Sequence, residues 1–176
     1  MSEYTPDKTG REHLIRLAVL TISDTRTKET DKSGGRILEL AQHAGIEVAE
    51  YTLCTDDAEA IHSIVAGWLL RSEIDAIITT GGTGIAARDV TLEAVRPLFE
   101  KELDGFGELF RYLSFAEDIG TRSVLSRAAA GAAKEKMIFA LPGSTGAVTL
   151  AMRRIILPEI RHMLHELTKH RSGAGE

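Results

Sequence analysis

Four short apolar runs, separated by segments with helical periodicity, constrain the fold of this chain more than any other feature. They cover residues 14–23, 46–54, 74–80 and 136–143. The runs at 14–23 and 136–143 are typical of buried strands in a parallel sheet, and those at 46–54 and 74–80 are interpreted as two further strands. Because strands and helices alternate, right-handed crossovers should connect the parallel strands. The sequence therefore predicts an α/β fold, a three-layer αβα sandwich with a mostly parallel central sheet.

The segments between these runs carry helical signals. The clearest has apolar residues at i, i+3, i+4, i+7 and i+8, which form a single helical stripe: Ile61, Ile64, Val65, Trp68 and Leu69. Helices are also predicted over residues 33–45, 91–103 and 145–169. Pro97 should make the helix at 91–103 irregular, and Pro158 should divide the last one, because proline lacks the N–H that a helix interior needs.

Length and charge limit the class of protein. The 176 residues suit one domain, which we expect to span residues 14–170 between disordered tails at 1–13 and 171–176. The net charge of −5 disfavours non-specific binding to nucleic acid. No apolar run approaches the ~20 residues that span a bilayer, and the polar N-terminus lacks the apolar core of a secretory signal. We therefore expect a cytoplasmic protein that binds neither nucleic acid nor membrane.

Small polar residues and glycines follow each of the four predicted strands. The sequences are SDT at 23–25, TDD at 55–57, TGGTG at 80–84 and PGST at 142–145. Taken singly, SDT and TDD could be helix caps and PGST a turn. Ligands of open parallel sheets, however, bind beyond the carboxyl ends of the strands, which share one edge. Four such ends predict a binding site at that edge.

The TGGTG loop indicates anion binding, since its glycines free backbone N–H groups to point at a phosphate. It is not a Walker A loop, because no lysine lies near Gly84. The spacing Gly82-x-Gly84-x-x-Ala87 matches a loose dinucleotide fingerprint, but it follows the third strand, and the acidic residue at the required distance, Glu102, sits in a helical pattern. A nicotinamide site is therefore disfavoured.

Two aspartates accompany the anion-binding loops. Asp56 follows the second strand, and Asp89 lies shortly after the glycine loop. A carboxylate beside a bound phosphate is repulsive unless a cation lies between them, and Mg²⁺ takes one or two carboxylates together with phosphate oxygens. The pair thus predicts a magnesium-phosphate site. Two points stay open: Asp89 could cap the helix after it, and Arg88 could add positive charge or point to solvent.

Three other groups of residues have less specific interpretations. Cys54, the single cysteine, is expected to be a small buried apolar residue and not a reactive thiol. His162 and His165 are expected on a solvated or subunit-contact face and not in a metal site. The aromatic residues within 99–115 pack in the core or form a subunit interface; in the second case Glu108 and Ser114 lie near an edge of the site.

With these residues assembled, the chain closely resembles the MoaB/MogA family of molybdenum cofactor biosynthesis proteins, and more the MoaB branch than the MogA branch. The matching segments run through most of residues 14–165, and their ordered set is highly specific. They are LTISDTRTKETDKSGG (20–35), LCTDDAEAI (53–61), ITTGGTGIAARDVT (78–91), DGFGELFRYLSF (104–115), LSRAAAG (125–131) and FALPGST (139–145).

The resemblance implies an α/β domain that binds molybdopterin. It also implies a catalytic activity. Active family members transfer AMP from ATP to the terminal phosphate of molybdopterin, release pyrophosphate and require Mg²⁺. Family members assemble as trimers, and the MoaB branch often as hexamers, so a homotrimer or homohexamer is implied here. Other proteins of the same pathway are further partners to consider.

The resemblance also implies roles for individual residues. Asp56 and Asp89 match the two family aspartates linked to catalysis and, with the reasoning above, to Mg²⁺. The residues implied to bind molybdopterin or nucleotide are Ser23, Asp24, Thr25, Ser33, Thr80, Gly81, Gly82, Thr83, Gly84, Glu108, Ser126, Pro142, Gly143 and Ser144. The alternative function is that of a non-catalytic molybdopterin-binding or scaffold protein of the same pathway.

Overall fold

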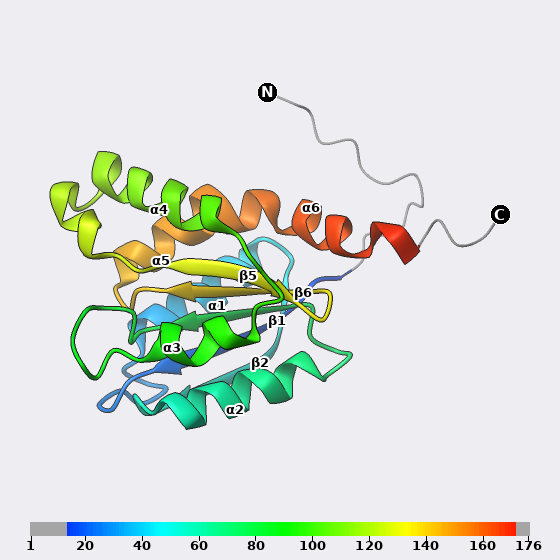
Figure 1. Cartoon of the computed structure of the whole chain (residues 1–176), viewed down its shortest axis with the longest axis horizontal. Coiled ribbons are helices and arrows are strands. Elements are labelled where there is room, and N and C mark those ends of the chain that lie inside the picture. The colour runs from blue at the N-terminus through cyan, green and yellow to red at the C-terminus, as the bar shows by residue number, and fades with distance from the viewer. Residues whose placement is uncertain (1–13, 172–176) are drawn as a thin grey trace.

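The computed structural model describes residues 14–171, and its centre is one six-stranded sheet (Figure 1). The strand order is β2-β1-β3-β6-β5-β4. Strands β2, β1, β3 and β6 are parallel, whereas β5 runs antiparallel to β6 and β4 antiparallel to β5. The mostly parallel sheet is therefore as predicted. The strands are β1 (Arg16–Ile22), β2 (Glu47–Cys54), β3 (Ala76–Thr80), β4 (Lys101–Glu102), β5 (Ala129–Ala133) and β6 (Lys136–Leu141).

Helices cover both faces of this sheet. α2 and α3 pack on one face, and α1, α4, α5 and α6 pack on the other (Figure 1). The prediction of three layers is thus confirmed. The helices are α1 (Lys32–His43), α2 (Ala58–Leu69), α3 (Thr91–Val95), α4 (Asp104–Glu117), α5 (Thr145–Ala151) and α6 (Leu157–Thr168), with the 3₁₀ turns η1 (Arg96–Leu98), η2 (Gly120–Leu125) and η4 (Lys169–Arg171) and the π segment η3 (Met152–Ile156).

The central strands are apolar throughout because both of their faces are buried. Along β1, Leu17 and Val19 point into the core under α1, α4, α5 and α6, whereas Ala18 and Leu20 point into the core under α2 and α3. Successive side chains of a strand alternate between faces. Full burial of each leucine contributes roughly 1.5–3 kcal/mol, so the run at 14–23 forms a stable strand only with both helical layers in place.

The order of the strands creates the place for a site. The chain leaves β1 through α1 toward β2, and then returns through α2 to β3 on the other side of β1. The two crossovers lie on opposite faces of the sheet. Ligands of such folds bind at the crevice where the strand order reverses, which here lies beyond the carboxyl ends of β1 and β3.

The prediction of one helix over residues 91–103 is wrong in its second half. Only α3 is α-helical, and a 3₁₀ turn that contains Pro97 follows it. The chain then becomes extended, because the N–H groups of Glu100 and Leu103 donate to carbonyls of Ala132 and Ala130 at the edge of β5. Pairing with this neighbouring strand outweighs the helical pattern of the local sequence.

The closing helical region divides as predicted, but without a loop. α5 passes into the π segment η3, and Pro158 then lies in the first turn of α6. Because η3 continues directly into α6, Pro158 leaves a carbonyl of the preceding turn without an N–H donor. The wider π turn accommodates the change of hydrogen-bonding pattern.

Two further expectations concern the tails of the chain and the absence of a membrane-spanning segment. The tails predicted at 1–13 and 171–176 lie outside the described residues, except Arg171, whose backbone ends η4. In the part of the chain that the structure describes, none of the helices combines the length and apolar character that a membrane crossing requires.

Candidate functional site

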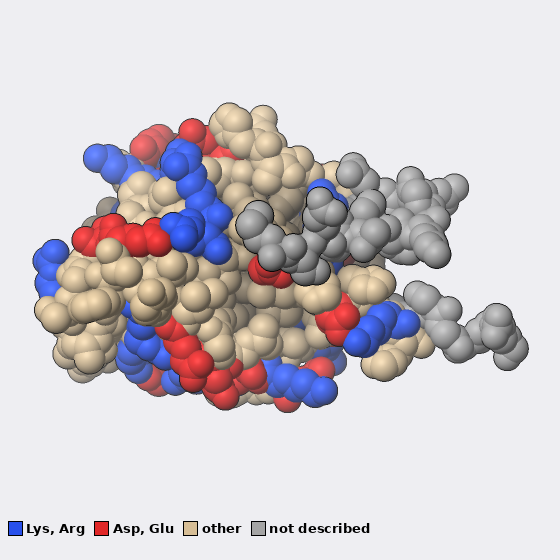
Figure 2. Space-filling view, turned by 90° about the horizontal axis from the view of Figure 1, so that it is seen from above, with Lys and Arg blue, Asp and Glu red and all other residues tan. Residues whose placement is uncertain are grey.

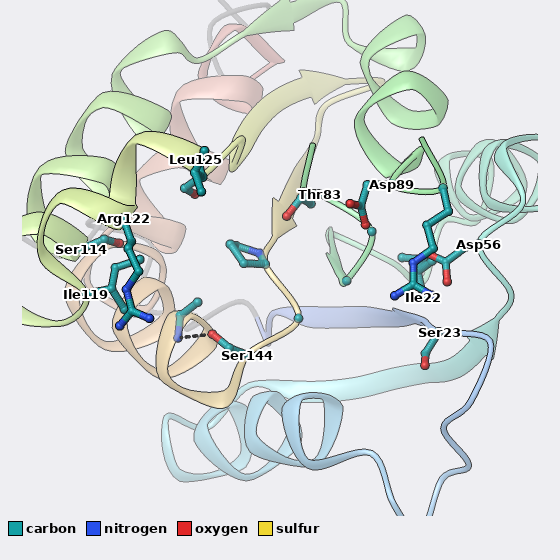
Figure 3. Close-up of a pocket in the computed structure, with 18 of the residues that line it drawn as sticks. Ile22, Ser23, Asp56, Thr83, Asp89, Ser114, Ile119, Arg122, Leu125 and Ser144 are labelled. Atoms are coloured by element: carbon teal, nitrogen blue, oxygen red, sulfur yellow. Dashed lines mark hydrogen bonds between the residues drawn. The ribbon is translucent and has the colours of Figure 1, made fainter. Parts of the chain in front are cut away.

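The chain segments that follow β1, β2, β3 and β6 line one cavity of about 490 Å³, a volume within the usual range of small-molecule sites. In Figure 3, Asp56, Asp89 and Ser23 lie on one side of this hollow, Arg122 and Ser144 lie on the other, and Thr83 lies between. Most of the residues implied by sequence line the cavity. They are Ser23, Thr25, Asp56, Gly81, Gly82, Thr83, Gly84, Asp89, Ser126, Pro142, Gly143 and Ser144.

Four of the implied residues lie outside the lining, three of them in supporting positions. Asp24 accepts a hydrogen bond from the backbone N–H of Asp56, Ser33 is buried, and the Thr80 hydroxyl donates to the carbonyl of Pro142 at 3.1 Å. Glu108 is exposed on α4 and is not part of the wall. The first three therefore hold the loops in place, while Glu108 has no contact with the cavity.

Glycine is required in the TGGTG loop for geometric reasons. Gly81 and Gly82 have φ of 102° and 63°, in the region that side chains rarely adopt. A Cβ at Gly81 would lie 2.3 Å from the carbonyl oxygen of Ile22, and a Cβ at Gly82 would lie 2.4 Å from Thr91 Oγ1. The Thr91 hydroxyl also donates to the carbonyl of Gly81 at 2.8 Å. The loop is thus folded tightly between the end of β1 and the start of α3.

The carboxylate of Asp89 folds back onto this loop. Its Oδ2 accepts the N–H of Ala86 at 2.9 Å, and a Cβ at Gly84 would lie 2.6 Å from the same oxygen. The N-cap of α3 is Val90, and no side chain caps that helix. The alternative in which Asp89 caps the helix is therefore wrong, and its carboxylate forms part of the cavity wall.

Asp56 approaches the same loop from the end of β2. A Cβ at Gly82 would lie 3.1 Å from its Oδ1. Burial raises the pKa of the Asp56 carboxyl, and the negative charges of Asp24 and Asp89 raise it further, although Arg88 partly offsets them. An added cation would favour the charged form of this carboxylate. The pair of aspartates therefore suits a divalent cation.

A magnesium ion at this place would depend on its substrate. Within residues 14–171, no group of three or more histidine, cysteine, aspartate or glutamate side chains is arranged to hold a metal. Mg²⁺ commonly binds through one or two carboxylates and substrate phosphates, with water in its remaining positions. Asp56 and Asp89 fit that mode of binding. A permanent metal centre would need more ligands from the protein than these two carboxylates.

The cavity wall balances charges of both signs. Its three acidic residues, Asp56, Asp89 and Asp118, face three arginines. Of the arginines, Arg26 and Arg122 were missed by sequence reasoning. Arg26 is close to the SDT motif, so its place in the same loop was a usable signal. Arg122 belongs to η2, and only the folded structure brings it to the wall. A ligand with phosphate groups and a bound cation complements such a wall.

Arg127, also missed, braces the glycine loop from outside the cavity. Its Nε donates to the carbonyl of Thr83 at 3.2 Å and its Nη2 to the carbonyl of Asp89 at 3.1 Å. Its other contacts are two hydrogen bonds to Glu93, of 2.6 and 3.2 Å. The Arg127 guanidinium thus holds the segment from Thr83 to Asp89 at both of its ends.

Two further candidates from the sequence are Cys54 and the aromatic residues within 99–115. Cys54 is only partly buried and packs against the core under α2; burial raises the pKa of its thiol to about 11, with help from the charges of Asp56 and Asp57. Among the aromatics, Phe110 is 1% exposed, whereas Tyr112 is 66% and Phe115 54% exposed. Core packing and an exposed face are therefore both realised in the same segment.

The exposed aromatics belong to a mostly apolar area that Arg111 also lines. Tyr112 and Phe115 on α4 and Val124 on η2 line a second, shallow hollow. Seen from the side of α4 and α6, Figure 2 shows basic and acidic side chains mixed over the surface, with an uncharged area at the left, where Figure 1 places the end of α4. This area is the candidate for contact with another chain.

Comparison with known proteins gives one consistent result. Residues 18–162 match the family model described as "Probable molybdopterin binding domain". The chain is 55% identical to molybdenum cofactor biosynthesis protein B of Staphylococcus aureus (strain MRSA252) over 171 residues, which is 96% of this chain and 100% of that protein. It is 58% identical to the protein of the same name in Staphylococcus carnosus (strain TM300) over 170 residues, 96% of this chain and 98% of the relative.

Solved structures agree with the sequence comparisons. A crystal structure of molybdenum cofactor biosynthesis protein B superposes with a TM-score of 0.87 at 50% identity and covers 90% of this chain and 98% of its own. The tungsten cofactor synthesizing protein MoaB from Pyrococcus furiosus superposes with a TM-score of 0.76 at 38% identity and covers 88% and 97%.

Proposed function

Because this chain belongs to the MoaB/MogA family of molybdenum cofactor biosynthesis proteins, we propose that it is a molybdopterin adenylyltransferase. In the proposed reaction, an oxygen of the terminal phosphate of molybdopterin attacks the α-phosphorus of ATP. A new P–O bond forms while the bond from the α-phosphorus to the bridging oxygen breaks. Pyrophosphate leaves with that electron pair, and adenylylated molybdopterin is the product.

The observation that carries this proposal is the placement of two carboxylates against one glycine loop. Asp56 approaches Gly82, and Asp89 approaches Gly84, in a cavity that also presents arginines. A site for an uncharged ligand would have no need of this balance. A polyphosphate with Mg²⁺ matches it, because phosphates complement the arginines and the cation complements the aspartates.

The protein needs no strong general base for this chemistry. A phosphate monoester has a second pKa of about 6 and is already largely ionised at pH 7. The residues therefore have to bind, orient and neutralise charge. Asp56 and Asp89 would hold Mg²⁺, which supplies charge neutralisation of the phosphates when bound. The TGGTG loop would anchor phosphate, and the SDT and PGST segments would close the site around nucleotide or pterin.

A non-catalytic molybdopterin-binding or scaffold protein of the same pathway is the second candidate, since the same loops would serve binding alone. We also propose self-association through the mostly apolar area around Tyr112, Phe115 and Val124, which are 66%, 54% and 79% exposed. A homotrimer or homohexamer is the expected form, and sedimentation analysis tests it. The cytoplasmic location and the lack of nucleic-acid partners remain predictions.

One incubation separates the two functions. The purified protein is mixed with molybdopterin, ATP and Mg²⁺, and mass spectrometry follows the mass of adenylylated molybdopterin. If the protein transfers AMP, this product and pyrophosphate should accumulate until their molar amounts exceed that of the protein. Bound molybdopterin without product would favour the scaffold, and failure to bind molybdopterin would exclude both.

A further inference from the structure

One arginine of the cavity wall is held in place by other residues of the chain. Arg88 and Arg122 are exposed and make no hydrogen bonds to described residues, whereas Arg26 is half-buried. The Nη1 of Arg26 donates to Ser33 Oγ at 2.7 Å, and its Nη2 donates to the carbonyl of Gly143 at 3.2 Å. Arg26 thereby links the loop after β1 to the loop after β6.

A buried carboxylate lies behind this arginine. The side chain of Asp31 is 0% exposed, and its Oδ1 is 3.5 Å from Arg26 Nη1. The same oxygen accepts hydrogen bonds from Gly34 N at 3.0 Å and Ser33 Oγ at 3.1 Å, and Oδ2 accepts one from the Tyr51 hydroxyl at 2.7 Å. Burial acts to raise the pKa of Asp31, but the donated hydrogen bonds outweigh it and lower the pKa. Asp31 is therefore a fixed negative charge.

The local sequence fixes the position of that charge. Asp31 is the N-cap residue of α1, so the start of the helix determines where its carboxylate lies. A Cβ at Gly34 would lie 2.1 Å from Asp31 Oδ2 and would displace the carboxylate. The helix start, the buried carboxylate and the arginine in front of it consequently form one rigid unit.

Arg26 retains donors that can reach a ligand. A guanidinium has five N–H groups, and that of Arg26 makes two hydrogen bonds within the described residues. Its side chain is 34% exposed and lines the cavity. Guanidinium groups bind phosphate through paired hydrogen bonds, and a fixed guanidinium loses less conformational entropy on binding. The geometry therefore suits a phosphate group at this wall.

We propose that Arg26 is a phosphate-binding residue of the cavity and that Asp31 is its positioning residue. The inference rests on the proposed function and adds to it a phosphate contact that is separate from the two aspartates. The phosphate is either the terminal monoester of the pterin or a phosphate group of the nucleotide. Asp31 acts only through Arg26, since its own side chain is buried.

The test compares ligands with and without the phosphate. Calorimetry measures the dissociation constants of AMP and adenosine in one arm, and of molybdopterin and dephosphorylated molybdopterin in the other. In one of the two arms, Arg26→Gln should weaken binding of the phosphorylated ligand by about 10- to 100-fold. Binding of the ligand without phosphate in that arm should change little. Arg26→Lys should recover part of this loss. Arg71→Gln is the matched control, because Arg71 pairs with Glu50 and Glu73 away from the cavity.

Asp31→Asn and Ser33→Ala test the positioning role. Each should reduce the same phosphate preference by several-fold, and Ser33→Ala serves if Asp31→Asn does not fold. A merely structural role would lower the melting temperature and leave the preference unchanged. Retained preference in both arms for Arg26→Gln would overturn the inference while the proposed function stands. If the wild-type protein binds neither AMP nor molybdopterin, the proposed function fails and the inference fails with it.

Discussion

The backbone N–H of Asp56 donates a hydrogen bond of 3.0 Å to the carboxylate of Asp24, although 32 positions separate the two residues in sequence. This contact joins the loop after β2 to the loop after β1 at the cavity. It brings two negative charges together beside the glycine loop. Burial and the neighbouring charges of Asp24 and Asp89 disfavour the charged form of Asp56 in the folded protein, and in the proposed function a bound cation would offset this cost.

Asp56→Asn should raise the melting temperature near neutral pH in the absence of Mg²⁺. Burial and the charges of Asp24 and Asp89 raise the pKa of Asp56 in the folded state, so the folded protein binds this proton more tightly than the unfolded chain does. The resulting destabilisation is absent below the unfolded pKa of about 3.9. It grows as the pH rises to the folded pKa and is constant above it.

Thermal denaturation of both proteins between pH 4 and 8 measures this effect. The advantage of the variant should shrink toward pH 4, and Mg²⁺ with ATP should stabilise the wild type more than the variant. A variant that is less stable than the wild type at pH 7 would contradict the account of Asp56.

Substitution of Gly82 should damage both folding and binding. Gly82→Ala places a Cβ 2.4 Å from Thr91 Oγ1 at a residue whose φ is 63°. The expected loss is about 1–3 kcal/mol of unfolding free energy, and Gly82→Val should also weaken ligand binding by crowding the loop.

Gly67→Ala is the matched control in α2, because a Cβ at Gly67 would meet nothing within 4 Å. It should stabilise the protein by about 0.5–1 kcal/mol. Urea denaturation and a molybdopterin titration give the two readouts. Unchanged affinity in Gly82→Val would mean that the anion binds elsewhere.

Arg127→Met should slow the proposed reaction although Arg127 does not line the cavity. The change removes the hydrogen bonds to the carbonyls of Thr83 and Asp89, so the loop that carries Asp89 loses its brace. A fall of about 10-fold in kcat is expected, with a smaller change in KM for ATP.

Glu93→Gln separates the brace from its ion pair. It keeps a hydrogen-bond acceptor for Arg127, so it should cost much less, since exposed ion pairs contribute about 0–1 kcal/mol. Steady-state kinetics of both variants measure the difference. Equal losses in the two would show that the charge pair, and not the contact with the carbonyls, matters.

Cys54 should react slowly with thiol reagents. With a pKa of about 11, its thiolate fraction at pH 8 is roughly 100-fold smaller than that of an ordinary cysteine with a pKa near 9. Alkylation by iodoacetamide, compared with free cysteine, measures this. A rate that equals that of free cysteine would contradict the environment described for Cys54.

The strength of a local signal explains how much of the fold could be predicted. β1 and β6 were predicted because strands buried on both faces require long apolar runs. β5 was missed because its sequence, AAGAA, has little strand propensity. It is a strand because it pairs with β6 and β4, and β4 itself has two residues. Tertiary pairing, which a single sequence does not display, forms this edge of the sheet.

The same distinction applies to the site. The loops after β1, β2, β3 and β6 could be placed together, since the carboxyl ends of parallel strands share an edge. Asp89 and the glycine loop were therefore found from sequence. Arg122 and Arg127 come from η2 and the segment that follows it, and their approach to the cavity depends on how α4 packs. Their roles follow from three-dimensional contacts alone.

The most direct test of the central claim is adenylyl transfer by the wild-type protein and by Asp89→Asn. The asparagine can still accept the hydrogen bond from Ala86 that Asp89 accepts at 2.9 Å, so the loop should keep its shape. With molybdopterin and magnesium ATP, the account predicts adenylylated molybdopterin from the wild type. It also predicts at least a 100-fold slower rate, by order of magnitude, from the variant, with molybdopterin binding largely intact. Wild-type turnover by Asp89→Asn would contradict it.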